Sequence, residues 1–211
     1  MSIALLWIPA TLAATLAQTA RNAMQRSLTQ ALGVVGATQV RFLYGLPFAM
    51  LFLVGVTLAH GAPPPAPNAR FLAFAFGGAV AQIAATALML KAMKARSFAV
   101  AIAYTKTEPV QVALFAWAVL GEALTPLRFG LIALATLGVV LVSWKPGERP
   151  TAAGLLSSVL GVGSGAMFAL AAVSFRGGIL ALPMEASFLM RASTMLVWGL
   201  AIQTGLLLGY L

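Results

Sequence analysis

The chain lacks cysteine and aspartate altogether, and it has one histidine and four glutamates among its 211 residues. The missing cysteine excludes disulfides, thiolate metal sites and cysteine nucleophiles. The histidine, His60, lies between a long apolar run and a proline-rich stretch, so we expect it at a membrane interface; a metal site needs several clustered ligands. No HExxH-like spacing or Gly-x-Ser-x-Gly turn is present. We therefore expect neither enzyme activity nor a metal or organic cofactor.

Charge is scarce, at 8% of residues, and it is unequal in sign: thirteen Lys and Arg against four Glu give a net charge of +9. In a soluble domain such an excess would suggest a nucleic-acid partner. Here the basic residues are mostly dispersed at the ends of apolar runs, where they suit membrane topology and lipid headgroups. We therefore expect lipid, and no nucleic acid, around this chain.

Apolar residues dominate, at 61% of the chain, and the mean hydropathy is +0.98. Runs of 18 or more mostly apolar residues are typical of membrane-spanning helices, so the fold class predicted is all-α, a polytopic membrane helix bundle. The predicted spans are 3–19, 32–58, 71–90, 98–120, 126–144, 155–175 and 186–211. Pro9, Pro47 and Pro109 lie inside spans and should kink them, whereas Pro126 suits a first helical turn. The stretch 61–70 is too rich in proline to be helical.

Polar residues recur along one face of four spans. They are Thr11, Thr15, Gln18, Asn22 and Gln25 in the first, Gln82 and Thr86 in the third, Tyr104, Glu108 and Gln111 in the fourth, and Ser187, Arg191, Thr194 and Trp198 in the seventh. One such stripe could be a packing seam of interhelical hydrogen bonds. Four together favour a shared aqueous cavity. Glycines at 161, 163 and 165 are expected to let helices approach closely.

A weak internal repeat has a period of 150 residues. It places Arg26 on Arg176 and Arg41 on Arg191. Five helices lie between equivalent points, and because five is odd, the second copy enters the membrane upside down, as in many secondary transporters. We therefore expect inverted five-helix repeats, with a complete first repeat at 1–145 and a partial second one at 146–211. A full second copy would reach about position 294, so the chain is expected to be about three helices short.

The span 98–120 carries the most unusual residues. Glu108 lies about 15 Å along it, near the middle of a ~30 Å hydrocarbon core, where a charge costs on the order of 3 kcal/mol. Glu108 is either a proton- or substrate-binding group or one half of a static ion pair, and we favour the first. Lys106 lies about 200° away on a regular helix and reaches the same cavity only if Pro109 breaks the helix. Otherwise Lys106 serves a neighbouring helix or snorkels.

The remaining candidate site residues have two interpretations each. Arg41 and Arg191 either snorkel to the interface or line the cavity, where a guanidinium would favour a carboxylate or phosphate. Tyr44, Tyr104 and Trp198 either pack against helices or form the walls of the cavity. The predicted site is completed by four amides: Gln18, Asn22, Gln82 and Gln111.

Several short stretches carry a family resemblance. They are Arg41-Phe42 in the second span, Gly121-Glu122-Ala123-Leu124-Thr125 after the fourth, and Phe129-Gly130 and Gly138-Val139-Val140-Leu141 in the fifth. With the proline of the fourth span, they resemble the EamA family of the drug/metabolite transporter superfamily, over the first repeat and the start of the second. The resemblance implies a ten-helix carrier of the cytoplasmic (inner) membrane that exports or exchanges amino acids and other small metabolites. The family has mostly neutral residues where this chain has Lys106 and Glu108.

Membrane orientation is left open, because two arguments disagree. The positive-inside rule counts seven basic residues in the connections on one side and three on the other, and it favours an external amino terminus. The family resemblance implies a cytoplasmic one.

These observations predict a secondary transporter of small metabolites that works by alternating access and is coupled to protons through Glu108. The alternative is a non-transporting membrane subunit or assembly partner. Assembly as a homodimer is left open.

Overall fold

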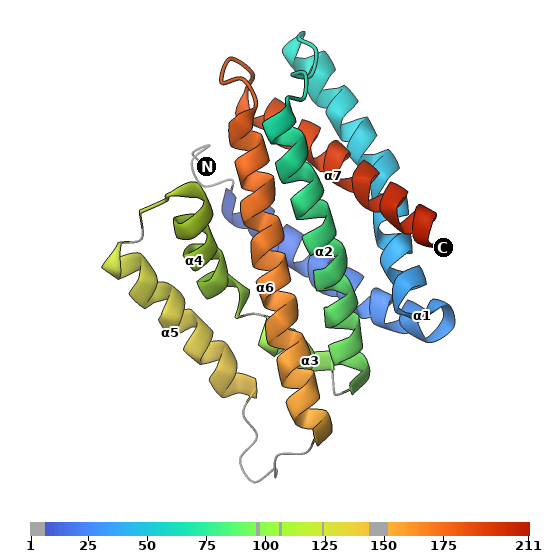
Figure 1. Cartoon of the computed structure of the whole chain (residues 1–211), viewed down its shortest axis with the longest axis vertical. Coiled ribbons are helices and arrows are strands. Elements are labelled where there is room, and N and C mark those ends of the chain that lie inside the picture. Colours follow the sequence, from blue (N-terminus) through green and yellow to red (C-terminus); the bar gives the residue numbers. More distant parts are fainter. Residues whose placement is uncertain (1–6, 96–97, 106, 124, 144–151) are drawn as a thin grey trace.

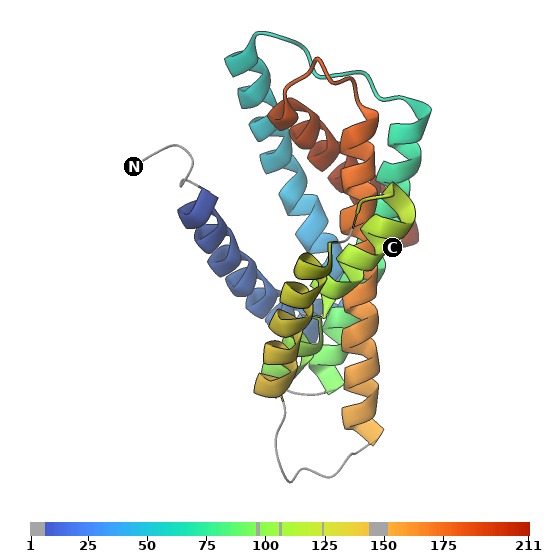
Figure 2. The same cartoon turned by 90° about the vertical axis from the view of Figure 1, so that its left-hand side faces the viewer.

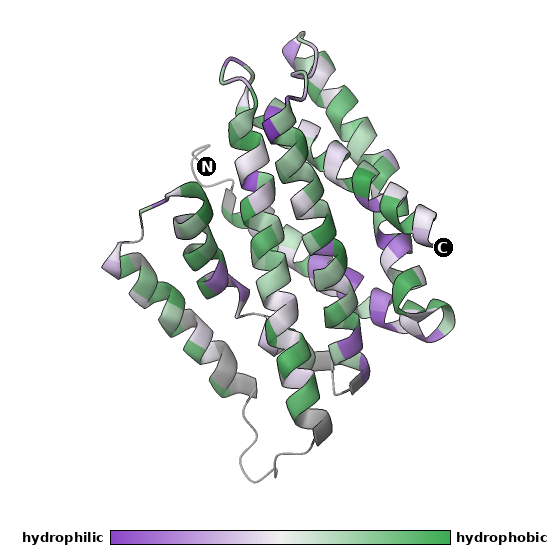
Figure 3. Ribbon diagram, in the orientation of Figure 1, coloured by the Kyte–Doolittle hydropathy of each residue, from purple (hydrophilic) through white to green (hydrophobic). Residues whose placement is uncertain are grey.

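The computed structural model describes residues 7–95, 98–105, 107–123, 125–143 and 152–211, and every regular element in these ranges is a helix. The helices are α1 (Trp7–His60), α2 (Ala69–Ala95), α3 (Phe98–Thr105), α4 (Glu108–Leu120), α5 (Pro126–Ser143), α6 (Ala152–Ala181) and α7 (Phe188–Tyr210). Four described segments are long and apolar enough to cross a membrane: Thr11–His60, Ala69–Lys94, Leu155–Ala181 and Phe188–Tyr210. Figure 3 shows predominantly apolar ribbons along these helices. The predicted all-α bundle of apolar helices is confirmed.

Helix α1 contains the first two predicted spans, joined by a sharp bend. Its 54 residues would extend about 80 Å if straight, far more than a ~30 Å hydrocarbon core. Gly33 interrupts it with φ 69° and ψ −176°, and Figure 2 shows the first half (7–32) diverging from the second half (34–60). The bounds predicted for these spans, with the first ending at residue 19 and the second beginning at residue 32, are wrong, because the stretch between them contains neither glycine nor proline and stays helical. The break is at Gly33 rather than at Pro47, which lies inside the helical second half.

Helices α2 and α6 lie side by side at the centre of the bundle (Figures 1 and 2). Glycines allow aromatic rings to sit between them: a Cβ on Gly78 would lie 2.6 Å from the Phe175 ring, and one on Gly177 would lie 2.7 Å from the Phe74 ring. Ser164 Oγ donates to the Ala85 carbonyl at 2.8 Å. Small residues and hydroxyl bonds of this kind hold helices together in lipid, where water does not drive association.

Two groups of buried residues pack on the other faces of α2. One joins the second half of α1, α2 and α3 through Ala37, Met89, Leu90, Ala92, Met93 and Ala101. The other joins α2, α7 and the end of α6 through Phe71, Ala75, Met195 and Leu182, which directly follows α6. In Figure 1, α7 and the second half of α1 lie on one side of the central pair, and α4 and α5 lie on the other.

The proline-rich stretch predicted to be non-helical at 61–70 is so over 61–68, whereas Ala69 and Arg70 already belong to α2. The connection ends in a side-chain cap. Asn68 Oδ1 accepts from the backbone N–H of Phe71 at 2.8 Å, which is the usual way to satisfy a first-turn donor. Asn68 Nδ2 donates to the Ala181 carbonyl at 2.7 Å. One side chain therefore fixes the start of α2 against the end of α6.

The segments aligned by the 150-residue period run in opposite directions. The first half of α1 runs opposite to α6, and the second half runs opposite to α7 (Figures 1 and 2). An inverted repeat requires this arrangement. The repeat itself, with boundaries at 1–145 and 146–211, stays a prediction.

Replacement of Gly33 by alanine is expected to destabilise the fold by about 1–3 kcal/mol, because its dihedral angles lie in a region that only glycine adopts readily. Equilibrium unfolding in mixed micelles would measure the change. Gly55→Ala is the matched control: Gly55 is helical, and an added Cβ there meets no atom within 4 Å, so it should be neutral or slightly stabilising. Equal stabilities of the two variants would contradict the role of Gly33.

Candidate functional site

The span predicted at 98–120 consists of two helices in the structure. Helix α3 ends at Thr105, α4 begins at Glu108, and Pro109 lies in the first turn of α4. At the junction, the Thr107 N–H and Oγ1 both donate to the Tyr104 carbonyl, at 3.2 and 2.9 Å. The hydroxyl of Thr107 thus helps to satisfy a carbonyl that loses its regular helical partner. The break is therefore a turn that these two hydrogen bonds stabilise.

This break rests against two glycines of α6. A Cβ on Gly165 would lie 2.9 Å from the Thr105 carbonyl oxygen and 3.3 Å from the Glu108 backbone nitrogen, and one on Gly161 would lie 2.5 Å from the Tyr104 Cβ. The two glycines are four residues apart, so they share one helix face. The Thr105 carbonyl oxygen at the break therefore lies against α6. Lys106 lies outside the described residues.

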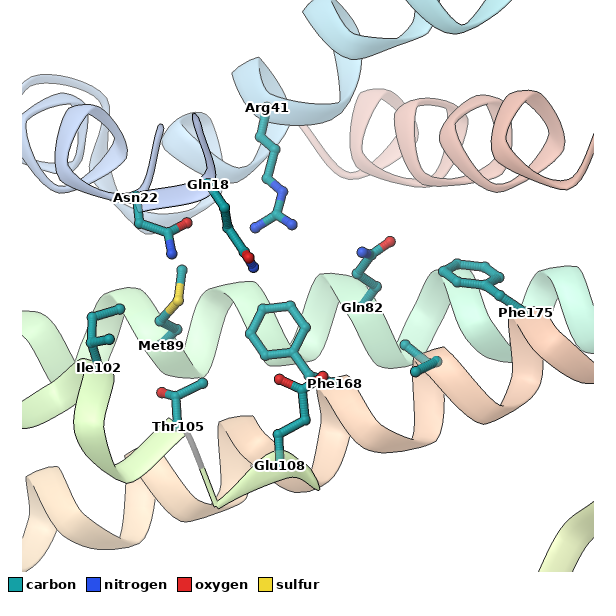
Figure 4. A pocket seen from close by; sticks show the side chains of 12 residues that line it. Gln18, Asn22, Arg41, Gln82, Met89, Ile102, Thr105, Glu108, Phe168 and Phe175 are labelled. Atoms are coloured by element: carbon teal, nitrogen blue, oxygen red, sulfur yellow. The ribbon is translucent and has the colours of Figure 1, made fainter. Parts of the chain in front are cut away.

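A cavity of about 230 Å³ lies beside the break. Its lining comes from five helices, and Figure 4 shows these side chains converging from several sides. The lining residues are Gln18, Asn22 and Arg41 of α1, Gln82 and Met89 of α2, Ile102 and Thr105 of α3, Glu108 of α4, and Phe168, Ala171, Ala172 and Phe175 of α6. Five of the predicted site residues meet here: Gln18, Asn22, Arg41, Gln82 and Glu108.

The guanidinium of Arg41 is held by one hydroxyl and two aromatic rings. Nη1 donates to Thr86 Oγ1 at 3.3 Å, and Thr86 Oγ1 donates to the Gln82 carbonyl at 2.9 Å. Arg41 Cζ lies 5.5 Å from the centroid of the Phe42 ring and 5.9 Å from that of Phe168. These distances permit cation–π attraction. The guanidinium is therefore oriented at the cavity wall.

Glu108 enters the same cavity from the opposite side. Figure 4 shows its carboxylate pointing toward the Phe168 ring, with Arg41 on the other side of that ring. Glu108 is also the acidic residue in the first turn of α4, where the helix dipole stabilises an anion by about 0.3–1 kcal/mol. A second hollow of about 380 Å³ is lined by Gln18, Glu108, Pro109 and Val112. The carboxylate therefore borders two hollows.

The amide of Asn22 adds an acceptor to the cavity. Asn22 is buried, and its Oδ1 has no hydrogen-bond partner among the described residues. A buried acceptor without a partner costs about 1–3 kcal/mol. A bound water or a donor on a ligand would remove that cost.

The other predicted site residues lie elsewhere. Tyr104 packs on Gly161, and Gln111 Nε2 donates to Thr107 Oγ1 at 3.3 Å. Tyr44 is 67% exposed on the outer side of α1. Trp198 contacts the Phe71 ring edge-on, with the centroids 6.2 Å apart. None of these four lines the cavity described above.

Arg191 also lies outside this cavity, so of the two arginines for which a cavity-lining position was one alternative, only Arg41 has it. It is buried near the start of α7, where Nη1 contacts Met184 Sδ at 3.0 Å and the Ile179 carbonyl at 3.5 Å. Helix α7 begins at Phe188, so Arg191 is in its first turn rather than two turns into a span. From there it reaches back to the end of α6.

Sequence reasoning missed the face that α6 presents to the cavity. Phe168, Ala171, Ala172 and Phe175 recur at spacings of three and four and so share one face. That periodicity was the available signal, but an apolar stripe on a membrane helix is equally typical of ordinary packing. Thr105 was missed for a similar reason, because a threonine hydroxyl commonly bonds its own helix, as here to the Ala101 carbonyl at 3.1 Å.

The stretch Gly121 to Thr125 connects α4 and α5, with a left-handed glycine as its first residue. Gly121 has φ 69°, and its N–H donates to the Trp117 carbonyl, as in an αL cap. The Glu122 N–H donates to the Ala116 carbonyl. The Glu122 carboxylate accepts a hydrogen bond from Arg176 Nε at 2.5 Å. The turn is thereby tied to α6 by an exposed ion pair, away from the cavity.

Comparison with known proteins gives one family. The family model described as EamA-like transporter family matches residues 3–144, about two thirds of the chain. Searches of curated proteins and of solved structures found no significant match.

Proposed function

The chain belongs to the EamA-like transporter family, and on that premise we propose that it is a secondary transporter of small organic metabolites, amino-acid-like compounds among them, that works by alternating access. Membership makes it a multi-pass membrane protein of a transporter family rather than of an enzyme family. Its partners are then membrane lipid and a small-molecule substrate.

One observation supports the binding role of this cavity above all others: Arg41 and Glu108 enter it from opposite sides, beside a break in a membrane helix. Broken helices near the bilayer midplane are a recurrent way to build transporter binding sites, because they release backbone and side-chain groups for a ligand. The guanidinium suits a carboxylate or phosphate of the substrate. The carboxylate suits an ammonium group or a proton.

We further propose proton coupling through Glu108, and the same geometry supports it. The Glu108 carboxylate borders both the cavity and the second hollow. It can therefore exchange its proton through one of these two hollows while the substrate occupies the other. Substrate and proton then alter each other's affinity, which is the thermodynamic requirement for coupling. We place the protein in the cytoplasmic membrane. Export or exchange as the direction, and a homodimer as the assembly, stay predictions.

Counterflow in proteoliposomes tests this proposal without assuming a coupling ion. Proteoliposomes that contain the purified protein are loaded with one unlabelled compound from a panel of amino acids, dicarboxylates, amines and nucleosides. Entry of the same compound in labelled form is then followed. We expect at least one compound to accumulate transiently, and Arg41→Gln to reduce its accumulation. No counterflow with any compound, together with recovery of the protein in a stable complex with another membrane protein, would favour a non-transporting subunit.

A further inference from the structure

A larger cavity of about 420 Å³ lies on the other side of Arg41, between α2, α6, α7 and both halves of α1, the first half contributing Arg21. Most of its lining is apolar, and the small side chains of two glycines and one alanine leave space open inside it. The lining residues are Arg21, Arg41, Phe42, Gly45, Gln82, Phe175, Ile179, Ala192, Met195, Leu196, Gly199, Leu200 and Gln203. We refer to it as the apolar cavity, and to the one beside Glu108 as the polar cavity.

The two cavities share three lining residues: Arg41, Gln82 and Phe175. Arg41 therefore stands at their junction, and a group bound to its guanidinium has space on both sides. Gln82 is fixed at this junction, because its Oε1 accepts a hydrogen bond from Gln203 Nε2 at 2.5 Å. Apart from that bond and the guanidinium of Arg21, the walls are mainly aliphatic and aromatic side chains.

The volumes decide what each cavity can hold. Binding sites for small organic molecules usually occupy about 300–1,000 Å³, and the polar cavity, at about 230 Å³, falls below that range. The apolar cavity, at about 420 Å³, is more than twice the ~150 Å³ of an engineered cavity that admits benzene. A ligand with a small charged end and a sizeable apolar part matches both.

We propose that the binding site is bipartite and takes amphipathic carboxylates. The carboxylate binds Arg41 at the junction, the polar remainder of the head lies in the polar cavity, and an unbranched alkyl or aromatic substituent fills the apolar cavity. The inference rests on the proposed function only for the claim that this ligand is the transported cargo. Binding itself is a separate property and is tested separately.

Ala192 offers a direct way to fill the apolar cavity. It lines that cavity from α7, whereas Ala201, nine residues later and so on the opposite face of the same helix, is exposed. Ala192→Phe and Ala201→Phe are therefore the same chemical change inside and outside the cavity. Ala192→Leu supplies a milder version if the larger ring prevents folding.

The experiment measures binding of labelled L-alanine, L-norleucine, L-phenylalanine and L-phenylalaninamide to the purified chain in lipid nanodiscs. Norleucine carries three more methylenes than alanine, so full burial would favour it by about 50-fold. We expect most of that preference in the wild type and in Ala201→Phe, and a preference below about fivefold in the Ala192 variants. Phenylalaninamide, which lacks the carboxylate, should bind more than tenfold more weakly than phenylalanine in the wild type.

Four results would overturn the inference in whole or in part. One is a wild type that binds none of the amino acids or shows no chain-length preference, and another is an unchanged preference in both Ala192 variants. The third is a preference that appears in detergent and vanishes in nanodiscs, which would mean that lipid acyl chains fill the apolar cavity. Equal binding of phenylalanine and its amide would overturn the carboxylate assignment. Binding as expected without counterflow of any bound probe would instead sink the proposed transport function and leave the bipartite site standing.

Discussion

Glu108→Gln is expected to abolish accumulation driven by a pH gradient while leaving counterflow exchange measurable. The substitution keeps the size and one oxygen of the side chain but removes its ability to carry a proton at neutral pH. Coupling between two ligands of one protein typically amounts to 5–150-fold in affinity, and loss of the titrating group removes it. Uptake into proteoliposomes with and without an imposed gradient, using a compound that the wild type exchanges, measures the effect.

Glu122→Gln is the matched control for this experiment. Glu122 forms an exposed ion pair with Arg176 at the turn between α4 and α5, and such pairs contribute about 0.2–1 kcal/mol. It is outside the cavity, so its loss should leave gradient-driven uptake near the wild-type level. If both variants keep the wild-type response to the gradient, Glu108 is not the coupling group. If both lose it, the effect is a general consequence of removing an acidic residue.

The residues that the sequence identified best are those that stand out from their surroundings. Glu108 and Arg41 are charges inside long apolar runs, and their burial cost requires a cavity or partners. The structure brings both to one cavity with Gln18, Asn22 and Gln82. Polar stripes were also informative, although only the inner part of the first one reaches the cavity, and Thr11 and Thr15 are exposed. Thr15 Oγ1 simply donates to the Thr11 carbonyl at 2.8 Å.

What the sequence did not reveal depends on packing between distant segments. Phe168 is one of twelve phenylalanines, and only the fold places its ring between the Arg41 and Glu108 side chains (Figure 4). The repeat suggested equivalent roles for Arg41 and Arg191. The structure places Arg41 about two turns after the bend at Gly33, whereas Arg191 lies in the first turn of α7. To predict the position of the bend in α1, one would have had to weigh Gly33 against Pro47. A proline can be accommodated within a membrane helix, whereas a positive φ at an internal residue ends the regular helix outright.

The shape of the break before Glu108 depends on the surface of α6 as much as on Pro109. A proline in a helix removes one hydrogen bond and bends the chain, but it does not decide where the freed segment goes. Here the segment packs directly on the bare backbone of α6 at Gly161 and Gly165. Small residues four apart are typical of close helix contacts in membranes. They fix the level at which α4 starts, and with it the position of the Glu108 carboxylate.

Gly165→Ala is therefore expected to displace Glu108 and to impair coupling. The added Cβ would lie 2.9 Å from the Thr105 carbonyl oxygen and 3.3 Å from the Glu108 nitrogen, and both are backbone atoms that cannot rotate away. Overpacking of this kind costs about 1–3 kcal/mol, which either lowers stability or moves the break away from α6. Equilibrium unfolding and gradient-driven uptake, measured on the same preparation, separate these two consequences.

Gly163→Ala makes the comparison specific, because it adds the same methyl group two residues away on the same helix. Its Cβ would lie 3.8 Å from Leu88 Cδ1, an ordinary contact with a side chain that can adjust. Stability and gradient-driven uptake should therefore stay close to the wild type in this variant. If Gly165→Ala lowers stability yet responds to the pH gradient as the wild type does, Gly165 serves packing alone. A folded Gly165→Ala protein that retains counterflow but loses its response to the gradient would show that the contact between Gly165 and the break positions the proton-binding carboxylate.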